Sequence, residues 1–170
     1  MDFKTLLNTK ELISLDGGMG TMLQARGLKM GETPEALNLE NPRVLIEIHK
    51  EYLAAGADII YANTFGANRY KLEHCGYSVD RVIRAGICNA RTAVSESENK
   101  EALVALDIGP IGQLLEPTGT LTFEEAYNIY KEQVEAGSGA DVIVFETMTD
   151  LYELKAAVLA AKECSKLPII

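Results

Sequence analysis

The chain has 170 residues, of which 47% are hydrophobic and 24% charged, and its formal net charge is −9. This length suits one globular domain, residues 1–170. The acidic balance argues against nucleic acid or an anionic membrane surface as a partner, since both attract basic patches. No apolar run approaches the roughly 20 residues of a membrane helix, and the first residues lack the apolar core of a signal peptide. We therefore expect a cytoplasmic protein.

Four short segments have the character of buried parallel β-strands, because they are continuous apolar runs rich in Val and Ile. They are residues 12–15, 57–62, 102–108 and 141–145, and a fifth strand begins at Leu167. No linker rich in Pro or Ser divides the chain. The longest stretch without clear periodicity, residues 27–41, is expected to be a loop over the strand ends.

Amphipathic helical patterns lie between these strands. The first begins at Pro42, a residue suited to a first helical turn, and ends before Gly56. The second has its apolar face at Val82, Ile83, Ile87, Ala90 and Val94. The third opens with a capping box of Thr122 and Glu125 and ends near Gly137. The fourth has its apolar face at Leu151, Leu154, Val158 and Ala161. This alternation predicts right-handed crossovers and a parallel sheet.

The number of units indicates an incomplete barrel. Four strand–helix units in 170 residues correspond to about 40 residues per unit, whereas an eight-unit (β/α)₈ TIM barrel has about 250 residues. The sequence thus predicts an α/β chain that forms the first half of such a barrel, with four units and the start of a fifth strand. The alternative is a small doubly wound sheet, but residues 16–20 read Asp-Gly-Gly-Met-Gly and lack its usual glycine signature.

Two carboxylates follow predicted strands that are distant in sequence. Asp16 comes directly after the first strand and Glu146 after the fourth, and in a barrel the carboxyl ends of the strands build the site. With the flexible Gly17 and Gly18 beside it, Asp16 suits the zwitterionic end of an amino acid. The alternatives are structural: Asp16 caps a short helix, and Glu146 starts a helix that Asp150 caps.

Other polar residues are less informative. Asn63 and Thr64 follow the second predicted strand, and Asp107 lies at the end of the third, so the loops that follow could line the same pocket. Asp58 and Asp141 begin strands, which is the end of a barrel associated with stability. We expect His49 and His74 to be surface residues. We expect the three cysteines, Cys75, Cys88 and Cys164, to be small buried hydrophobic residues. These residues predict neither a metal site nor a catalytic set.

Several motifs, in this order, resemble those of the homocysteine S-methyltransferase family. They are residues 15–24, 34–39, 55–60 with 63–67, and 139–143 with 145–148. Within the family, the likeness is greatest to the homocysteine-binding modules of cobalamin-dependent methionine synthases.

The resemblance implies a (β/α)₈ barrel that methylates the sulfur of homocysteine to give methionine. It implies that Asp16 and Glu146 contact the amino group of homocysteine, while the backbone at Gly17 and Gly18 receives the amino-acid end. It also implies a zinc ion, held by three cysteines, that binds the substrate thiol as thiolate. The expected methyl donor is methyltetrahydrofolate acting through cobalamin, with S-methylmethionine and betaine as alternatives.

The sequence departs from the family at the metal. The zinc cysteines of the family lie in later strands, in a Gly-Gly-Cys-Cys-Gly type of motif, and Cys75, Cys88 and Cys164 do not occupy those positions. We therefore expect residues 1–170 to carry the amino-acid-binding half of the barrel, without zinc or activity of its own. Its expected partners are homocysteine, the missing C-terminal half-barrel, and folate and cobalamin modules. The alternatives are a non-catalytic binding module completed by a partner and an unrelated small α/β enzyme.

Overall fold

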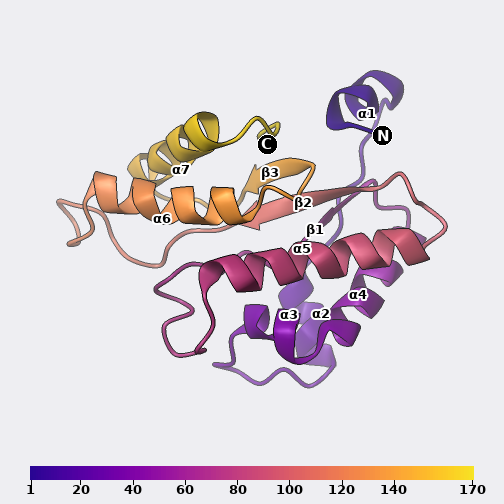
Figure 1. Ribbon diagram of the computed structural model, residues 1–170, viewed down its shortest axis with the longest axis horizontal. Coiled ribbons are helices and arrows are strands. Elements are labelled where there is room, and N and C mark those ends of the chain that lie inside the picture. The colour runs from indigo at the N-terminus through magenta and orange to yellow at the C-terminus, as the bar shows by residue number, and fades with distance from the viewer.

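The computed structural model describes residues 1–170 and contains a three-stranded parallel sheet (Figure 1). Its strands are β1 (Ile59–Tyr61), β2 (Leu103–Ile108) and β3 (Val142–Phe145), hydrogen-bonded in the order β1-β2-β3. Single parallel bridges extend the sheet on both sides, from Leu15 to Ile59 and from Ile169 to Ile143. The segments predicted as first and fifth strands therefore pair with the sheet but contribute one bridge each instead of a full strand.

The strand order decides between the two predicted architectures. Each strand lies beside the one that precedes it in the chain, from Leu15 through β1, β2 and β3 to Ile169. A doubly wound sheet reverses its direction at a switch point, and this sheet shows no such reversal. The order is that of consecutive strands in a barrel wall.

The helices confirm the predicted alternation. Four longer helices are α4 (Pro42–Ala54), α5 (Val79–Glu96), α6 (Phe123–Ala136) and α7 (Leu151–Cys164). The shorter ones are α1 (Phe3–Thr9), α2 (Met19–Ala25), the 3₁₀ turn η1 (Pro34–Ala36) and α3 (Leu37–Glu40). The predicted capping box of Thr122 and Glu125 is present, and α6 ends at Gly137 as expected. Residues 27–41, expected to be loop, contain η1 and α3.

Side chains along the strands alternate between two apolar cores. The larger core lies between the sheet and the longer helices and takes Ile60 from β1, Leu106 from β2 and Ile143 from β3. The smaller core lies on the opposite face and contains Leu6, Ile59, Leu103, Ala105, Val142 and Val144. Leu6 belongs to α1, which stands apart from the other helices near the start of β2 (Figure 1). Helix α1 thus covers the sheet face that the longer helices leave free.

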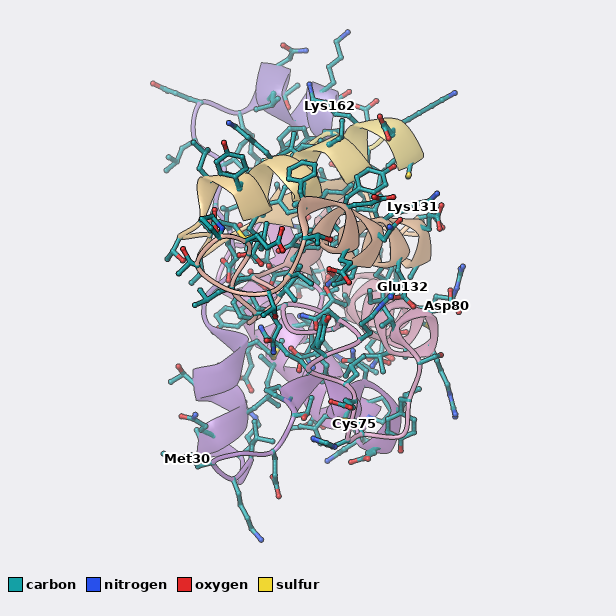
Figure 2. All side chains as sticks on the ribbon, turned by 90° about the vertical axis from the view of Figure 1, so that its left-hand side faces the viewer. Met30, Cys75, Asp80, Lys131, Glu132 and Lys162 are labelled. Atoms are coloured by element: carbon teal, nitrogen blue, oxygen red, sulfur yellow. The ribbon has the colours of Figure 1, made fainter.

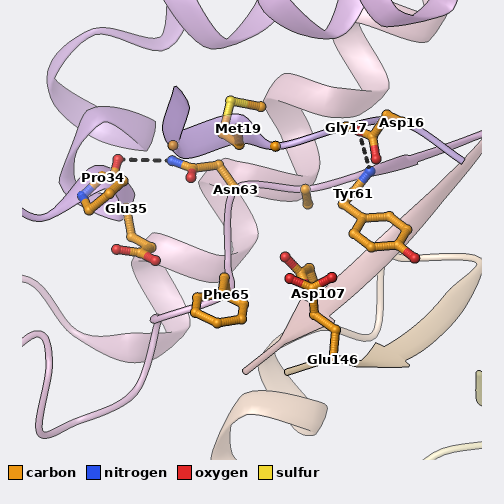
Figure 3. Close-up of a pocket in the computed structure, with 13 residues that line it drawn as sticks. Asp16, Gly17, Met19, Pro34, Glu35, Tyr61, Asn63, Phe65, Asp107 and Glu146 are labelled. Atoms are coloured by element: carbon orange, nitrogen blue, oxygen red, sulfur yellow. Dashed lines mark hydrogen bonds between the residues drawn. The ribbon is translucent and has the colours of Figure 1, made fainter. Parts of the chain in front are cut away.

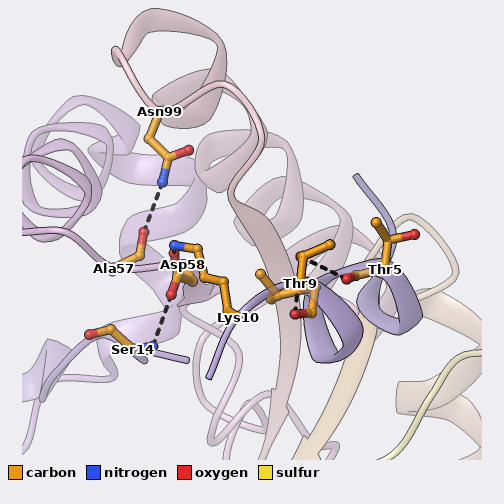
Figure 4. Close-up of polar contacts among 8 residues, drawn as sticks. Thr5, Thr9, Lys10, Ser14, Ala57, Asp58 and Asn99 are labelled. Carbon is orange, nitrogen blue, oxygen red and sulfur yellow. Dashed lines mark hydrogen bonds and ion pairs between the residues drawn. The ribbon is translucent and has the colours of Figure 1, made fainter. Parts of the chain in front are cut away.

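Two aspartates, Asp58 and Asp141, connect neighbouring segments where the strands begin, and Figure 4 shows the contacts of Asp58. Asp58 forms an ion pair with Lys10 and accepts a hydrogen bond of 3.0 Å from the backbone N–H of Ser14. Asp141 accepts two hydrogen bonds of 2.7 Å from the Arg91 guanidinium and one of 2.8 Å from the backbone N–H of Val104. Each aspartate thereby holds the start of the preceding strand segment, which is the structural role expected of a residue at this end of a barrel.

Two predictions about single side chains are wrong, and one predicted helix face is shifted. His49 is fully buried, because it shares a face of α4 with Leu45 and Leu53. Cys88 is exposed, since it lies off the buried stripe of α5. The buried face of α7 is shifted from the predicted one. Ala161 is buried as predicted, Leu154 and Val158 are only half-buried, and the other buried residues are Glu153, Ala156, Ala157 and Ala160. Small alanines let α7 pack closely against α6, which leaves Leu151 at the edge with 62% of its surface exposed.

The outer surface of the helices is largely polar. Figure 2 shows Asp80, Lys131 and Glu132 on the outside of α5 and α6, and Arg69 pairs with Glu132 at 2.9 Å. None of the helices combines the length and apolar character needed to cross a membrane.

Candidate functional site

A cavity of about 380 Å³ opens where β1, β2 and β3 end (Figure 3). Its lining is Asp16, Gly17, Gly18, Met19, Gly20, Pro34, Glu35, Tyr61, Ala62, Asn63, Phe65, Asp107 and Glu146. Four of these residues are acidic, and none is a Lys, Arg, His, Ser or Cys. The cavity is therefore negatively polarised, and its lining contains no hydroxyl of serine, thiol of cysteine or amine of lysine.

The alternation of side chains between the two faces of the sheet determines where two of the four carboxylates lie. Asp107 continues the face of Leu103 and Ala105, and Glu146 continues the face of Val142 and Val144. Because side chains two residues apart point to the same side of a strand, both carboxylates lie above the smaller core. The cavity and α1 thus occupy opposite ends of one sheet face.

Asp16 is held against β1 by its backbone and its side chain. Its N–H donates to the carbonyl of Ile59 at 3.1 Å, and its Oδ2 accepts from the N–H of Tyr61 at 2.9 Å. Its Oδ1 is buried without a partner. Burial raises the pKa of Asp16 to about 7, with a smaller contribution from Glu146. The capping alternative is wrong, since Gly18 occupies the N-cap position of α2.

Glu146 follows β3 directly and is anchored through its backbone. Its N–H donates to the carbonyl of Ile108 at 3.1 Å, and its side chain is half-buried. Asp150 caps α7 by accepting from the N–H of Tyr152, so Glu146 has no capping role. The next residue, Thr147, has a φ of 58°, a conformation that is rare and costly for a β-branched side chain. This kink turns the chain away from the strand line directly after the carboxylate.

Asp107 is the most deeply buried of the carboxylates above the smaller core. Only 7% of its surface is exposed, and its Oδ1 has no hydrogen-bond partner. Burial raises its pKa well above the ordinary value, and the neighbouring Glu146 and Asp16 raise it further. The sequence placed Asp107 at the end of a predicted strand. Its burial and its position on the inner face could not be seen before the register was known.

Asn63 and Thr64 occupy different positions. Asn63 lines the cavity, and its Nδ2 donates to the Pro34 carbonyl at 2.8 Å and to Oδ1 of Asn38 at 3.0 Å. Thr64 is fully buried outside the lining. Its hydroxyl donates to the carbonyl of Asp107 at 2.8 Å and accepts from the N–H of Asp107 at 3.2 Å. Thr64 therefore fixes the backbone of Asp107.

The glycine segment forms one wall of the cavity through its backbone. Gly17, Gly18 and Gly20 all line the cavity. A Cβ at Gly17 would approach the Tyr52 ring to 3.1 Å, and the Tyr52 hydroxyl donates to the Gly18 carbonyl at 3.3 Å. The lack of side chains here lets a ligand approach the main chain directly.

Sequence reasoning missed Glu35 and Phe65 on the opposite wall. Glu35, on η1, accepts a hydrogen bond of 2.6 Å from the N–H of Gly66, where a Cβ would lie only 2.7 Å from the carboxylate. The Lys71 ammonium lies 5.1 Å from the centre of the Phe65 ring. The motif around Pro34 was visible in the sequence, but not that η1 folds back over the strand ends.

The cysteines do not form a metal centre. Cys75, Cys88 and Cys164 are separate free thiols, and none lines the cavity. No group of three or more His, Cys, Asp or Glu side chains in the structure is arranged to hold a metal ion. The donor set of these 170 residues therefore does not fit a cysteine-ligated zinc.

Comparisons with known proteins agree with this geometry. Methionine synthase of Mycobacterium tuberculosis (strain ATCC 25618 / H37Rv) is 34% identical over 175 residues, an alignment that covers 95% of this chain and 14% of that protein. Homocysteine S-methyltransferase YbgG of Bacillus subtilis (strain 168) is 29% identical over 179 residues, covering 93% of this chain and 57% of that protein. The chain therefore spans only part of the length of these relatives.

The fold agrees as well. The metallated form of the homocysteine methyltransferase MmuM from Escherichia coli superposes with a TM-score of 0.84 at 23% identity, over 98% of this chain and 64% of that one. The α/β arrangement is thus that of part of this enzyme. The family profile for homocysteine S-methyltransferase matches residues 13–170. The chain belongs to the homocysteine S-methyltransferase family.

Proposed function

We propose that this chain is the amino-acid-binding part of a homocysteine S-methyltransferase of the methionine synthase type, with the first four strand–helix units of a barrel. Asp16 and Glu146 contact the ammonium group of homocysteine, and the backbone at Gly17 and Gly18 receives its carboxylate end. Asn63 forms part of the cavity wall, and Thr64 holds the backbone of Asp107 in place through two hydrogen bonds. The observation that carries this proposal is that Asp16 and Glu146 face one cavity whose lining contains no cation.

The electrostatics of the cavity suit a ligand that brings its own positive charge. A buried carboxylate is costly unless a cation or hydrogen-bond donors pair with it. Asp16 has an unpartnered oxygen and a pKa raised to about 7. An ammonium group would favour the ionised carboxylate and lower this pKa. Binding should therefore release protons near neutral pH and strengthen as the pH rises towards 7.

Methyl transfer needs groups that the 170 residues do not hold. In the family the homocysteine thiol reacts as a zinc-bound thiolate, and no set of cysteines that could hold such a zinc ion lines the cavity. We propose that the zinc ligands come from a C-terminal half-barrel and that the chain alone is inactive. Methyltetrahydrofolate acting through cobalamin is the proposed donor system of the whole protein.

Exposed apolar residues on α7 favour a second candidate. Leu151 and Leu159 are 62% and 41% exposed, respectively, on the last helix of the chain. This surface suits a module that binds an amino acid and is completed by a partner without catalysing a reaction itself.

Calorimetric titration with L-homocysteine under reducing conditions tests the proposal. We expect binding that falls at least about tenfold in Asp16→Asn and in Glu146→Gln, since each variant removes a charge-assisted hydrogen bond worth about 1.5–3 kcal/mol. The matched control is Glu98→Gln on the exposed surface, which should bind like the wild type. 4-Mercaptobutyrate, which lacks the amino group, should bind weakly to all variants. Equal binding of homocysteine by the wild type and both site variants would contradict the proposal.

Methyl transfer to homocysteine, assayed with the chain alone and with an added C-terminal half, separates the two candidates. Activity only with the added half supports the enzyme. Binding without activity in either case supports the binding module.

A further inference from the structure

The contacts that hold the fold together give no reason for the burial of the Asp107 side chain. Its carboxyl group is more than nine-tenths buried, Oδ1 has no partner, and no cation lines the cavity it faces. In Figure 3, Asp107 and Glu146 lie on the same side of the cavity, with Asp16 above them in this view. The Thr64 hydroxyl bonds to both backbone groups of Asp107 and leaves its side chain free. The residue is therefore held rigidly, at a cost in desolvation that no partner within the chain offsets.

We propose that Asp107 is a further substrate-contacting residue, whose unpartnered oxygen accepts a hydrogen bond from the ammonium group of the amino-acid substrate. This inference rests on the proposed function and adds a third carboxylate to Asp16 and Glu146. An ammonium group has three N–H donors, so three converging carboxylates provide one acceptor for each. Asp107 would thus make the site specific for a primary amine.

In the empty site, the cluster need not carry three full negative charges. The titratable groups that face Asp107 are Glu146, Asp16, Glu35 and Tyr61, and all are acidic or neutral. Burial and these neighbours raise the pKa of Asp107, which favours the protonated carboxyl group in the empty site. As the ammonium enters, that proton leaves to solvent and the carboxylate pairs with the incoming cation. Proton release is a property that a merely structural aspartate would lack.

The inference predicts a loss of discrimination between amines. N-Methyl-L-homocysteine offers one N–H fewer than L-homocysteine, so the wild type should bind it about tenfold more weakly, a factor that corresponds to about 1.4 kcal/mol. Asp107→Asn should bind L-homocysteine about tenfold more weakly than the wild type. The same variant should bind the N-methyl ligand nearly as well as the wild type does, because that contact is already missing.

Calorimetry in two buffers of different ionisation enthalpy tests both parts of the inference. We expect Asp107→Asn to bind with fewer protons released and with reduced discrimination between the two ligands. Where Asp16→Asn loses binding but Asp107→Asn keeps wild-type affinity, discrimination and proton release, the inference is overturned and the proposed function stands. Where the wild type binds neither ligand, both are overturned.

A second measurement does not depend on the variant folding. In the wild-type chain with ¹³C-labelled aspartate, the carboxyl resonance of Asp107 should move on addition of L-homocysteine as the group ionises. An unchanged Asp107 resonance, together with a shifted Asp16 resonance, would also overturn the inference.

Discussion

The two ends of the sheet use the same residue type in opposite ways. Where the strands begin, Asp58 and Asp141 are each paired with a cation and with a backbone N–H of the preceding strand segment. Where the strands end, Asp16 and Asp107 each keep a buried oxygen without a partner. The Lys10 and Ser14 contacts outweigh burial and lower the pKa of Asp58, whereas burial raises the pKa of Asp16 to about 7.

This difference separates aspartates that stabilise the fold from aspartates that the fold tolerates. A carboxylate whose hydrogen bonds are satisfied within the chain contributes to stability. One that is buried and unpaired lowers stability, and it persists where function requires it. The comparison therefore supports the proposal that ligand binds at the end with the cavity, and it does so without reference to any relative.

The largest expected effect comes from breaking a paired aspartate. Asp141→Ala removes both hydrogen bonds from Arg91 and the one to the N–H of Val104, and we expect a loss of about 3 kcal/mol in the free energy of unfolding. Urea denaturation monitored by circular dichroism measures this loss. The control is Lys131→Ala, whose ion pair with Glu135 is long, at 3.9 Å, and exposed; it should cost less than about 0.5 kcal/mol. Equal effects of the two substitutions would contradict the stabilising role assigned to Asp141.

His49, which lies at neither end of the sheet, provides a further test of how an unpaired buried group affects stability at acid pH. His49 is fully buried with both ring nitrogens unpartnered, and burial lowers its pKa from 6.5 to about 4. The unfolded chain then binds more protons between these two pH values, so stability falls as the pH drops from 6.5 towards 4. The loss over this window should reach about 3 kcal/mol at 1.36 kcal/mol per pKa unit.

His49→Leu should abolish this contribution, because leucine cannot be protonated and leaves no polar atom unpaired. Urea denaturation at pH 7 and pH 4.5 would show a smaller difference for the variant than for the wild type. His74→Leu, at an exposed position, is the matched control and should leave the pH dependence unchanged. A wild-type stability that does not change between these pH values would contradict the assignment.

The sequence was sufficient for the order of the elements and for much of the site. Asp16 and Glu146 could be placed because each directly follows an apolar run, and in a parallel sheet such positions converge at one edge. The boundaries of α6 were also predictable, because its capping box and Gly137 are local signals.

Other features depend on contacts between distant segments. The role of Thr64 depends on Asp107, 43 residues away. The burial of His49 could not be predicted from its residue type alone, because a histidine in a helix can be either buried or exposed. The segment at residues 12–15 was predicted as a strand from its apolar character, but it has only one bridge, and Leu12 is 82% exposed.

The smallest expected effect concerns an unpaired aspartate and has the opposite sign to that of Asp141→Ala. The pKa of Asp16 is raised from 3.8 to about 7 in the folded chain, so the folded state binds the proton more tightly than the unfolded state does. The stability that this proton provides is fully present below pH 3.8 and is lost as the pH rises through about 7.

Asp16→Asn keeps an acceptor for the N–H of Tyr61 but carries no charge. In the absence of ligand, it should therefore be more stable than the wild type by about 1–2 kcal/mol at pH 8.5, and the gain should vanish near pH 4. Thermal unfolding at these two pH values measures the effect, and saturating L-homocysteine should reverse its sign, because only the wild type gains a paired carboxylate. A variant that is less stable than the wild type at pH 8.5 without ligand would show that Asp16 belongs with Asp58 and Asp141, as a residue that stabilises the fold.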